Sequence, residues 1–295
     1  MSFNSKIALY SFVLLIKAMK NILILTDFSL NSWNSIEYSL SLFQNKAYRF
    51  YLINASDIQD EEIKSNSVEK VGLATIKKPI DSKKEFKSLL KKIEDSPLKG
   101  AHTFTSIAVK TNLLIAVKNQ IKANKIDLII IGTNGLSTQG KRNIGSITED
   151  IITKVKCSTL VVPKDARFLG LKEIAFPTDY TYFYEAKLLQ NINDLFSYDG
   201  STLRFVYLAK NNEVLDKEQL WNKETIHDYF INKTHSFHSE VNKNLELSIQ
   251  KAIDQFGIDL IIMAAKNLNL FEQILFRPKM VSIKYYSKTP FLILH

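Results

Sequence analysis

Glycine and hydroxyl residues follow an apolar run near the middle of the chain, at a spacing suited to binding an anion. The apolar residues 128–131 lead directly into Gly132, Gly135 comes next, and nine further residues separate it from Gly145 and Ser146. Four β-type apolar residues indicate a buried strand that delivers the chain to a turn. Glycines in such a turn let backbone N–H groups approach an oxyanion closely.

A helix is predicted to begin beside the last of these glycines. Ser146 and Glu149 have the spacing of a capping box and precede the apolar positions Ile151, Ile152 and Val155. The free N–H groups at a helix start bind phosphate oxygens well. Each glycine or serine alone is also typical of an ordinary turn or cap. Their combination favours a nucleotide-phosphate site.

The pattern Gly-x2-Gly-x9-Gly-Ser resembles that of the universal stress protein family, whose ATP-binding members carry it between the fourth strand and the fourth helix. Residues 21–29 look like the first strand of that family, with Asp27 as the acidic residue at its end. The resemblance implies a five-stranded domain of the adenine nucleotide α-hydrolase type. It also implies that the domain binds ATP together with magnesium.

The resemblance further assigns roles to the positions that match the family's motif. Asp27 would contact the ribose or adenine, and Ile53 and Ile131, which end the second and fourth strands, would line the adenine pocket. The other implied cofactor-binding residues, around the ribose and phosphates, are Gly132, Asn134, Gly135, Gly145, Ser146, Ile147 and Thr148. The implied role is stress-response signalling. A nucleotide-independent interaction scaffold and an ATP-using enzyme are the alternatives.

A second phosphate-binding motif overlaps the same loop. Gly135, Gly140 and Lys141 match the opening of a P-loop, but Arg142 stands where a Ser or Thr hydroxyl should reach the metal ion. We therefore reject a P-loop. Lys141 and Arg142 are interpreted as loop residues that attract a triphosphate.

An internal repeat divides the 295 residues into two units. Placing Asp127 over Asp259 aligns residues 127–163 with 259–295 without a gap, and Asp27 recurs as Asp179. We predict one domain at 19–163, a second at 172–295 and a short linker between them. Residues 56–80 are polar and are interpreted as a surface excursion.

Within each unit, alternating strand and helix patterns predict an α/β doubly wound parallel sheet, which binds ligands outside the carboxyl ends of its strands. A second capping box, Ser82 and Glu85, is expected to start the clearest helix. The elements of the first unit are expected as strands at 21–25, 49–54, 103–109, 127–131 and 159–162, and helices at 32–43, 83–95, 112–123 and 147–156.

The two units differ where a nucleotide would bind. The repeat aligns Gly132, Gly135, Gly145 and Ser146 of the first unit with Ala264, Asn267, Arg277 and Pro278 of the second. We therefore expect one ATP site per chain, with Asp179 capping a turn. A different anion site made by Lys266, Arg277 and Lys279 is the alternative.

The final strands of the two units are both apolar. The resemblance to the universal stress protein family implies that residues 159–162 and 291–294 are edge strands through which two domains commonly associate, and an exposed apolar edge otherwise invites uncontrolled pairing. We therefore predict that these strands lie side by side across a pseudo-two-fold axis, which would make the chain an internal pseudo-dimer.

The N-terminal residues and the single cysteine indicate where in the cell the protein is expected to act. Residues 7–16 are apolar but too short to span a bilayer, and Lys17 follows. We interpret residues 1–18 as an extension upstream of a natural start at Met19, without stable membrane insertion; a membrane-associated helix is the alternative. The single cysteine, Cys157, favours a reducing cytoplasm and is interpreted as a buried small hydrophobe.

Charge and titratable residues point to no further chemistry. The formal charge of +9 is interpreted as solvated lysine, because no nucleic-acid motif accompanies it. His235 and His238 would face opposite sides of a strand, so they are not expected to share a metal. No nucleophile–base set or carboxylate pair is evident, and we expect no catalytic residues and at most slow ATP hydrolysis.

Overall fold

The computed structural model describes residues 21–56, 81–133, 145–195, 200–209, 214–241, 244–267, 274 and 288–295. The extension 1–18, nearly all of the excursion 56–80, and the loop with Lys141 and Arg142 lie outside these ranges. Within the described ranges, no helix combines the length and hydropathy needed to cross a bilayer.

The first half of the chain is a doubly wound parallel sheet with strand order β3-β2-β1-β4-β5. Every boundary lies within two residues of its predicted position. The strands are β1 (Asn21–Leu25), β2 (Arg49–Ala55), β3 (Thr103–Val109), β4 (Leu128–Thr133) and β5 (Ser158–Pro163), and the helices are α2 (Leu30–Leu42), α4 (Ser82–Glu94), α5 (Leu113–Asn124) and α6 (Ser146–Lys154).

The second half repeats this topology with strand order β8-β7-β6-β9-β10. All its neighbouring strands are again parallel. Its strands are β6 (Glu173–Thr178), β7 (Thr202–Ala209), β8 (His235–Val241), β9 (Leu260–Ala264) and β10 (Phe291–Leu294), and its helices are α7 (Ala186–Leu195), α8 (Lys217–Tyr229) and α9 (Leu245–Phe256).

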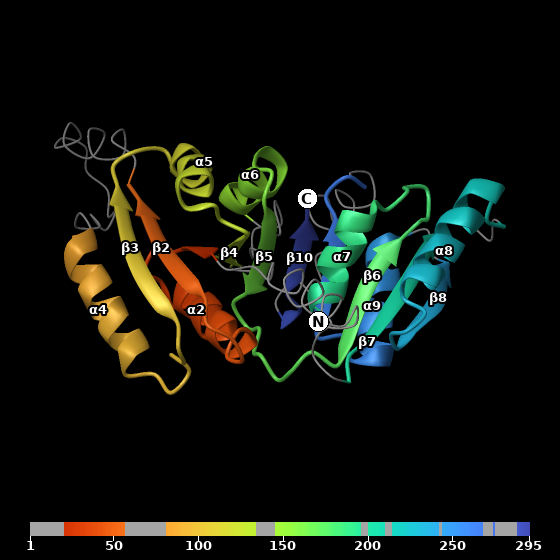
Figure 1. The fold of residues 1–295 in the computed structure, drawn as a ribbon, viewed down its shortest axis with the longest axis horizontal. Helices are drawn as coiled ribbons and strands as arrows, with labels where there is room; N and C mark the ends of the chain where they lie inside the picture. The colour runs from red at the N-terminus through yellow and green to blue at the C-terminus, as the bar shows by residue number, and fades with distance from the viewer. Residues whose placement is uncertain are drawn as a thin grey trace, which may run out of the picture.

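Strands β5 and β10 join the halves into one ten-stranded sheet (Figure 1). They pair antiparallel, and Leu160 lies opposite Leu292. These two leucines occupy the same position in the repeat, so the pseudo-two-fold axis passes between them. The predicted pairing of the final strands is confirmed.

The hydrophobic core consists of two layers, one on each face of the sheet. One layer contains buried side chains of α2, α4, α7 and α8, and the other contains those of α5, α6 and α9. Both layers cross the seam, because successive residues of β5 and β10 point to opposite faces: Leu160 and Leu292 belong to the first layer, and Val161 and Ile293 to the second. The seam is therefore part of the core.

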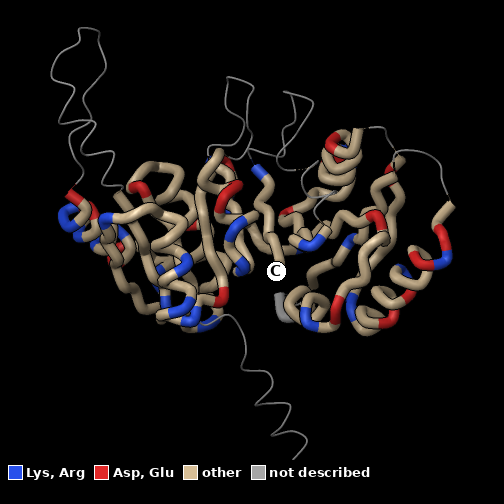
Figure 2. Tube along the Cα trace, turned by 90° about the horizontal axis from the view of Figure 1, so that it is seen from above, with Lys and Arg blue, Asp and Glu red and all other residues tan. Residues whose placement is uncertain are grey.

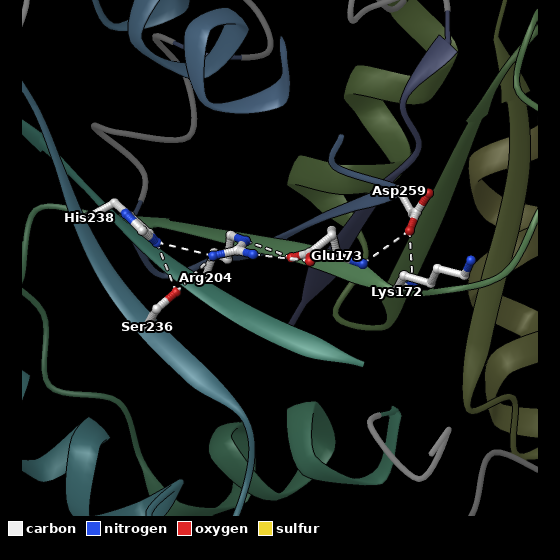
Figure 3. A network of polar contacts seen from close by, with 6 residues as sticks. All are labelled: Lys172, Glu173, Arg204, Ser236, His238 and Asp259. Carbon is white, nitrogen blue, oxygen red and sulfur yellow. Dashed lines mark hydrogen bonds and ion pairs between the residues drawn. The ribbon is translucent and has the colours of Figure 1, made fainter. Parts of the chain in front are cut away.

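Equivalent aspartates fix the amino ends of equivalent strands. Asp127 Oδ2 accepts a hydrogen bond from the N–H of Asn21 at 3.1 Å. In the second half, Asp259 Oδ2 accepts from the N–H groups of Lys172 at 2.8 Å and Glu173 at 3.0 Å (Figure 3). The repeat in the sequence is thus also a repeat of contacts.

The second half adds a polar network to this arrangement (Figure 3). The Arg204 guanidinium forms an ion pair with Glu173, with 2.6 Å between Nε and Oε2. Its Nη1 lies 3.2 Å from Ser236 Oγ, which lies 2.8 Å from His238 Nε2. The network links side chains of β6, β7 and β8.

The two histidines of β8 face opposite sides of the sheet, as predicted. His235 Nε2 lies 2.9 Å from Nδ1 of His227 on α8. The ring of His238 packs on Phe256 of α9, with centroids 4.3 Å apart. Helices α8 and α9 belong to different core layers, so the two rings are separated by the sheet.

The predicted cap of α4 is wrong by one residue. Asp81 caps the helix, and its Oδ1 accepts from the N–H groups of Lys83 and Lys84 at 3.1 and 3.3 Å. Ser82 is the first helical residue, and its hydroxyl donates instead to Asn54 Oδ1 at 3.0 Å. The carboxylate directly before Ser82 therefore takes the capping role.

The charged residues are spread over the molecule, and the single cysteine is buried as predicted. Basic and acidic residues are interspersed over both halves of the molecule (Figure 2). Cys157 is buried, and its Sγ lies 3.6 Å from the carbonyl oxygen of Ile126. Burial, with a smaller contribution from Asp127, raises the pKa of the Cys157 thiol to about 12, so the thiol is un-ionised at neutral pH.

Candidate functional site

The carboxyl ends of β1, β2 and β4 and the start of α6 surround a cavity of about 410 Å³. It lies at the edge of the sheet where open α/β domains bind ligands. The cavity is lined by every sequence-predicted site residue that the structure describes: Asp27, Ile53, Ile131, Gly132, Gly145, Ser146, Ile147 and Thr148. Asn134 and Gly135 lie outside the described residues.

One wall of the cavity is apolar. Leu25, Ile53 and Ile131 contribute from the ends of three neighbouring strands, and Ala55 and Leu113 extend the wall toward α5. Apolar walls with a few convergent polar groups are typical of small-molecule sites. This wall suits a flat apolar group.

A tight turn after β1 forms a polar part of the lining. Phe28 has a positive φ of 63°, and its N–H donates to Thr26 Oγ1 at 3.0 Å. Asp27 Oδ1 accepts from the N–H of Ser29 at 3.0 Å. Burial raises the pKa of Asp27, but hydrogen bonds from Ser29 and Ser32 outweigh it and hold the pKa below its ordinary value. Asp27 is therefore an ionised acceptor at neutral pH.

Asn54 connects this turn to α4 and was missed from the sequence. Its Nδ2 donates to the carbonyl oxygen of Thr26 at 2.8 Å, and its Oδ1 accepts from Ser82. Its place directly after Ile53, at a strand end, was an available signal. The other described lining residues missed from the sequence are Leu25, Thr26, Ser29, Asn31, Ser32, Ala55, Leu113 and Thr133.

Gly132 is required by the packing of α2 on β4. A Cβ at this position would lie 2.7 Å from the carbonyl oxygen of Asn31 and 3.4 Å from Ser35 Cβ. Contacts under 3.0 Å to backbone are essentially never seen for a real Cβ. Gly132 therefore lets the start of α2, with Asn31 and Ser32, come close to the cavity.

Gly145, and not Ser146, is the N-cap of α6. Gly145 has a φ of +78° and no side chain to cap the first-turn N–H groups, although its carbonyl oxygen accepts the helical hydrogen bond from the N–H of Glu149 at 3.1 Å. The predicted capping box of Ser146 and Glu149 is therefore wrong: Ser146 is the first helical residue. The cap position offers no competitor for an anion at these N–H groups, which the helix dipole also favours.

Residues 19–163 match the family model described as the universal stress protein family. The N-terminal half of this chain belongs to the universal stress protein family. No curated protein matches the chain at a significant level.

Solved universal stress proteins share the fold over almost the whole chain. A universal stress protein of Archaeoglobus fulgidus DSM 4304 is similar with 12% identity and a TM-score of 0.60, over 93% of this chain and 97% of its own. A protein of Pseudomonas aeruginosa UCBPP-PA14, provisionally assigned to the same family, is similar with 12% identity and a TM-score of 0.62, over 94% of this chain and 93% of its own. At this identity the likeness shows the fold.

Two described side chains of the second half, Tyr184 and Asn267, differ from their equivalents in the universal stress protein domain. Where that domain has Ser32, the second half has the buried Tyr184, whose hydroxyl lies 2.9 Å from Thr178 Oγ1. Asn267, aligned with the second glycine of the motif, donates from Nδ2 to Asp179 Oδ1 at 3.0 Å. Asp179 also accepts from the N–H of the second residue after it, as expected for a residue that caps a turn.

Of the residues in the alternative anion site, the structure describes only Lys266. Its ammonium forms an ion pair with Glu185. Arg277, Pro278 and Lys279 lie outside the described residues.

Proposed function

We propose that the universal stress protein domain binds ATP with magnesium in the cavity beside β1 and β4, and that the chain is an ATP-dependent stress-response or signalling module with one nucleotide per chain. The observation that carries this proposal is that the described residues predicted to bind a nucleotide, of which Asp27 is the first in the chain and Thr148 the last, all line one cavity. Its volume of about 410 Å³ falls within the range typical of small-molecule sites.

Each part of ATP has a chemical complement in the lining. The adenine would pack against Ile53, Ile131 and their apolar neighbours. The ionised Asp27 would accept hydrogen bonds from ribose hydroxyls. The phosphates would lie at the start of α6, where the cap residue Gly145 leaves room for them.

Magnesium would be bound to the phosphates of ATP and would enter the cavity together with them. Among the described residues, no group of three His, Cys, Asp or Glu side chains is placed to hold a metal ion. Magnesium is usually held by one or two carboxylates together with substrate phosphates. Asp27 is the one carboxylate among the described lining residues.

The proposal includes binding without rapid turnover. Asp27 is the one titratable side chain among the described lining residues, and its lowered pKa makes it a weak general base. We expect at most slow hydrolysis. We also expect the protein to act in the cytoplasm.

Nucleotide that co-purifies with the full chain tests this proposal. The protein is incubated with ATP and magnesium, freed of unbound ligand, denatured, and the released small molecules are identified by mass spectrometry. We expect ATP or ADP from the wild-type chain and none from Gly145→Arg. Absence of nucleotide from the wild-type chain would favour the nucleotide-independent scaffold instead.

A further inference from the structure

A second cavity, of about 200 Å³, lies in the C-terminal half of the chain. It is formed by α8 and its preceding residues, strands β7 and β8, and the turn after β6. Figure 1 shows α8, β7 and β8 together at one end of the molecule. Its lining residues are Tyr180, Tyr207, Leu215, Lys223, Phe237, His238 and Ser239. None of them belongs to the cavity of the universal stress protein domain.

The turns that follow β1 and β6 contact α4 and α8 in different ways. In the first half, Phe86 is the first buried residue of α4, and its ring packs edge-on against Phe28 with centroids 4.9 Å apart. Tyr180 is the repeat equivalent of Phe28, and both have positive φ. The first buried residue of α8 is Asn222, whose Nδ2 donates to the carbonyl oxygen of Tyr180 at 2.8 Å. The ring of Phe28 thus packs on an aromatic side chain of α4, whereas the backbone of Tyr180 bonds to an amide side chain of α8.

The Tyr180 hydroxyl is a buried group without a partner. Tyr180 is 1% exposed, and its ring stacks on Tyr207 with centroids 5.4 Å apart. Its hydroxyl oxygen is buried and makes no hydrogen bond. A buried polar group without a hydrogen bond destabilises the folded state. Burial also raises the pKa of Tyr180, so the hydroxyl keeps its proton and remains a donor.

The charge of the lining favours an anion. Lys223 Nζ lies 5.2 Å from the Phe237 ring centroid, at one side of the cavity. The ring of His238 packs on Phe256 of α9, on the other face of the sheet, so it adds no charge to this lining. No carboxylate occurs among the seven described lining residues.

We propose that this cavity binds a small carboxylate with a compact aromatic or branched aliphatic body. The carboxylate accepts a hydrogen bond from the Tyr180 hydroxyl and pairs with the Lys223 ammonium. The apolar body packs against Tyr207 and Phe237. This site does not depend on nucleotide binding in the N-terminal domain.

Titration of the full chain with three probes tests the proposal. The probes are benzoate, phenylacetate and 3-methylbutanoate, each beside its neutral amide, and binding is followed by chemical-shift changes of the protein. We expect at least one carboxylate to bind at least tenfold more tightly than its amide. Tyr180→Phe and Lys223→Met are each expected to weaken that carboxylate at least tenfold, and the matched Lys217→Met, on the exposed first turn of α8, to leave it unchanged.

Thermal unfolding separates a binding role of Tyr180 from a structural one. Tyr180→Phe keeps the ring that stacks on Tyr207 and removes an unpaired hydroxyl, so its unfolding temperature is expected to equal or exceed that of the wild type. The proposal is overturned if none of the carboxylates binds, if the amides bind equally well, or if neither substitution weakens binding.

Discussion

Gly132 and Gly145 line the same cavity, and each position requires glycine for a different reason. At Gly132 the space for a Cβ is occupied by the backbone of Asn31. At Gly145 nothing lies within 4 Å of the Cβ position, but the φ of +78° disfavours any side chain. Gly132 therefore permits close packing of α2 on β4, and Gly145 permits a backbone conformation with positive φ.

Gly132→Ala is expected to destabilise the chain by about 1–3 kcal/mol, because the added methyl group forces α2 away from β4. The matched change is Ala264→Gly at the equivalent position, where α7 starts later relative to the strand end than α2 does. Ala264→Gly also destabilises, by about 1 kcal/mol, through lost burial and added chain entropy. Denaturant unfolding measures both. Wild-type stability of Gly132→Ala would mean that α2 can shift freely.

Gly145→Arg is expected to weaken ATP binding at least 100-fold. The arginine side chain occupies the space beside the first turn of α6, where the phosphates are proposed to lie. The positive φ adds a folding cost of about 1–2 kcal/mol. Gly170→Arg is the matched control, because Gly170 also has a positive φ and open space but lies in the linker. Retained binding in Gly145→Arg would show that the phosphates lie elsewhere.

Asp27 gives ATP binding a pH dependence of known sign. Hydrogen bonds that favour the carboxylate hold the pKa of Asp27 below its ordinary value of 3.8, despite burial. Asp27 is therefore fully ionised, and able to accept hydrogen bonds from ATP, above its ordinary pKa. It loses its charge, and with it this contribution to ATP binding, as the pH falls through the lowered pKa.

We expect the ratio of wild-type to Asp27→Asn affinity for ATP to stay constant from pH 8 to pH 5 and to fall only in stronger acid. The ratio removes the titration of ATP itself. Calorimetry at each pH measures it, and a ratio that changes near neutral pH would contradict an ionised Asp27 as the acceptor.

At the scale of elements, the seam between β5 and β10 holds the two halves together. Leu160 and Leu292 pair on the pseudo-two-fold axis, and all residues of both strands are buried. Without β10, β5 would be an exposed apolar edge strand, which readily pairs with another copy.

The first domain expressed alone, as residues 19–164, is expected to dimerise or aggregate. Sedimentation velocity over a range of concentrations distinguishes these states. A stable monomer of this fragment at high concentration would contradict this account of the seam.

The strands could be predicted from apolar patterning, the repeat from the ungapped self-alignment of residues 127–163 with 259–295, and the seam from the family resemblance together with two apolar final strands. The caps of α4 and α6 could not. At both starts a Ser-x-x-Glu pattern was present, but Asp81 and Gly145 stand one residue earlier and take the cap position. Capping depends on backbone geometry that the pattern alone does not specify.

Only part of the candidate site could be predicted from the sequence, because some of its residues are placed by three-dimensional geometry. Glycines and strand-end residues of the nucleotide motif have a fixed spacing, and they identified one side of the cavity. Asn54 and Ser32 enter it through hydrogen bonds that depend on the three-dimensional path of α2 and α4. The cavity at Tyr180 is lined by the turn after β6, by β7 and β8 and by α8, and no periodicity indicates that these segments enclose a space.

At the scale of the whole molecule, two halves of one topology have different interiors at equivalent places. The first half keeps an open cavity at its strand ends. In the second half, Asn267 and Tyr184 bond to the residues that correspond to Asp27 and Thr26. The second half therefore completes the sheet and buries its central edge, and we assign the nucleotide to the first half alone.

Calorimetric titration of the full chain with ATP and magnesium tests this assignment most directly. Micromolar affinity corresponds to roughly 8 kcal/mol of binding free energy, which a site with Ala264 and Asn267 in place of the first two glycines of the motif is not expected to supply. We predict one ATP per chain, with binding lost in Gly145→Arg and retained in Gly170→Arg. Two equivalent sites per chain, or no binding by the wild-type protein, would contradict the account.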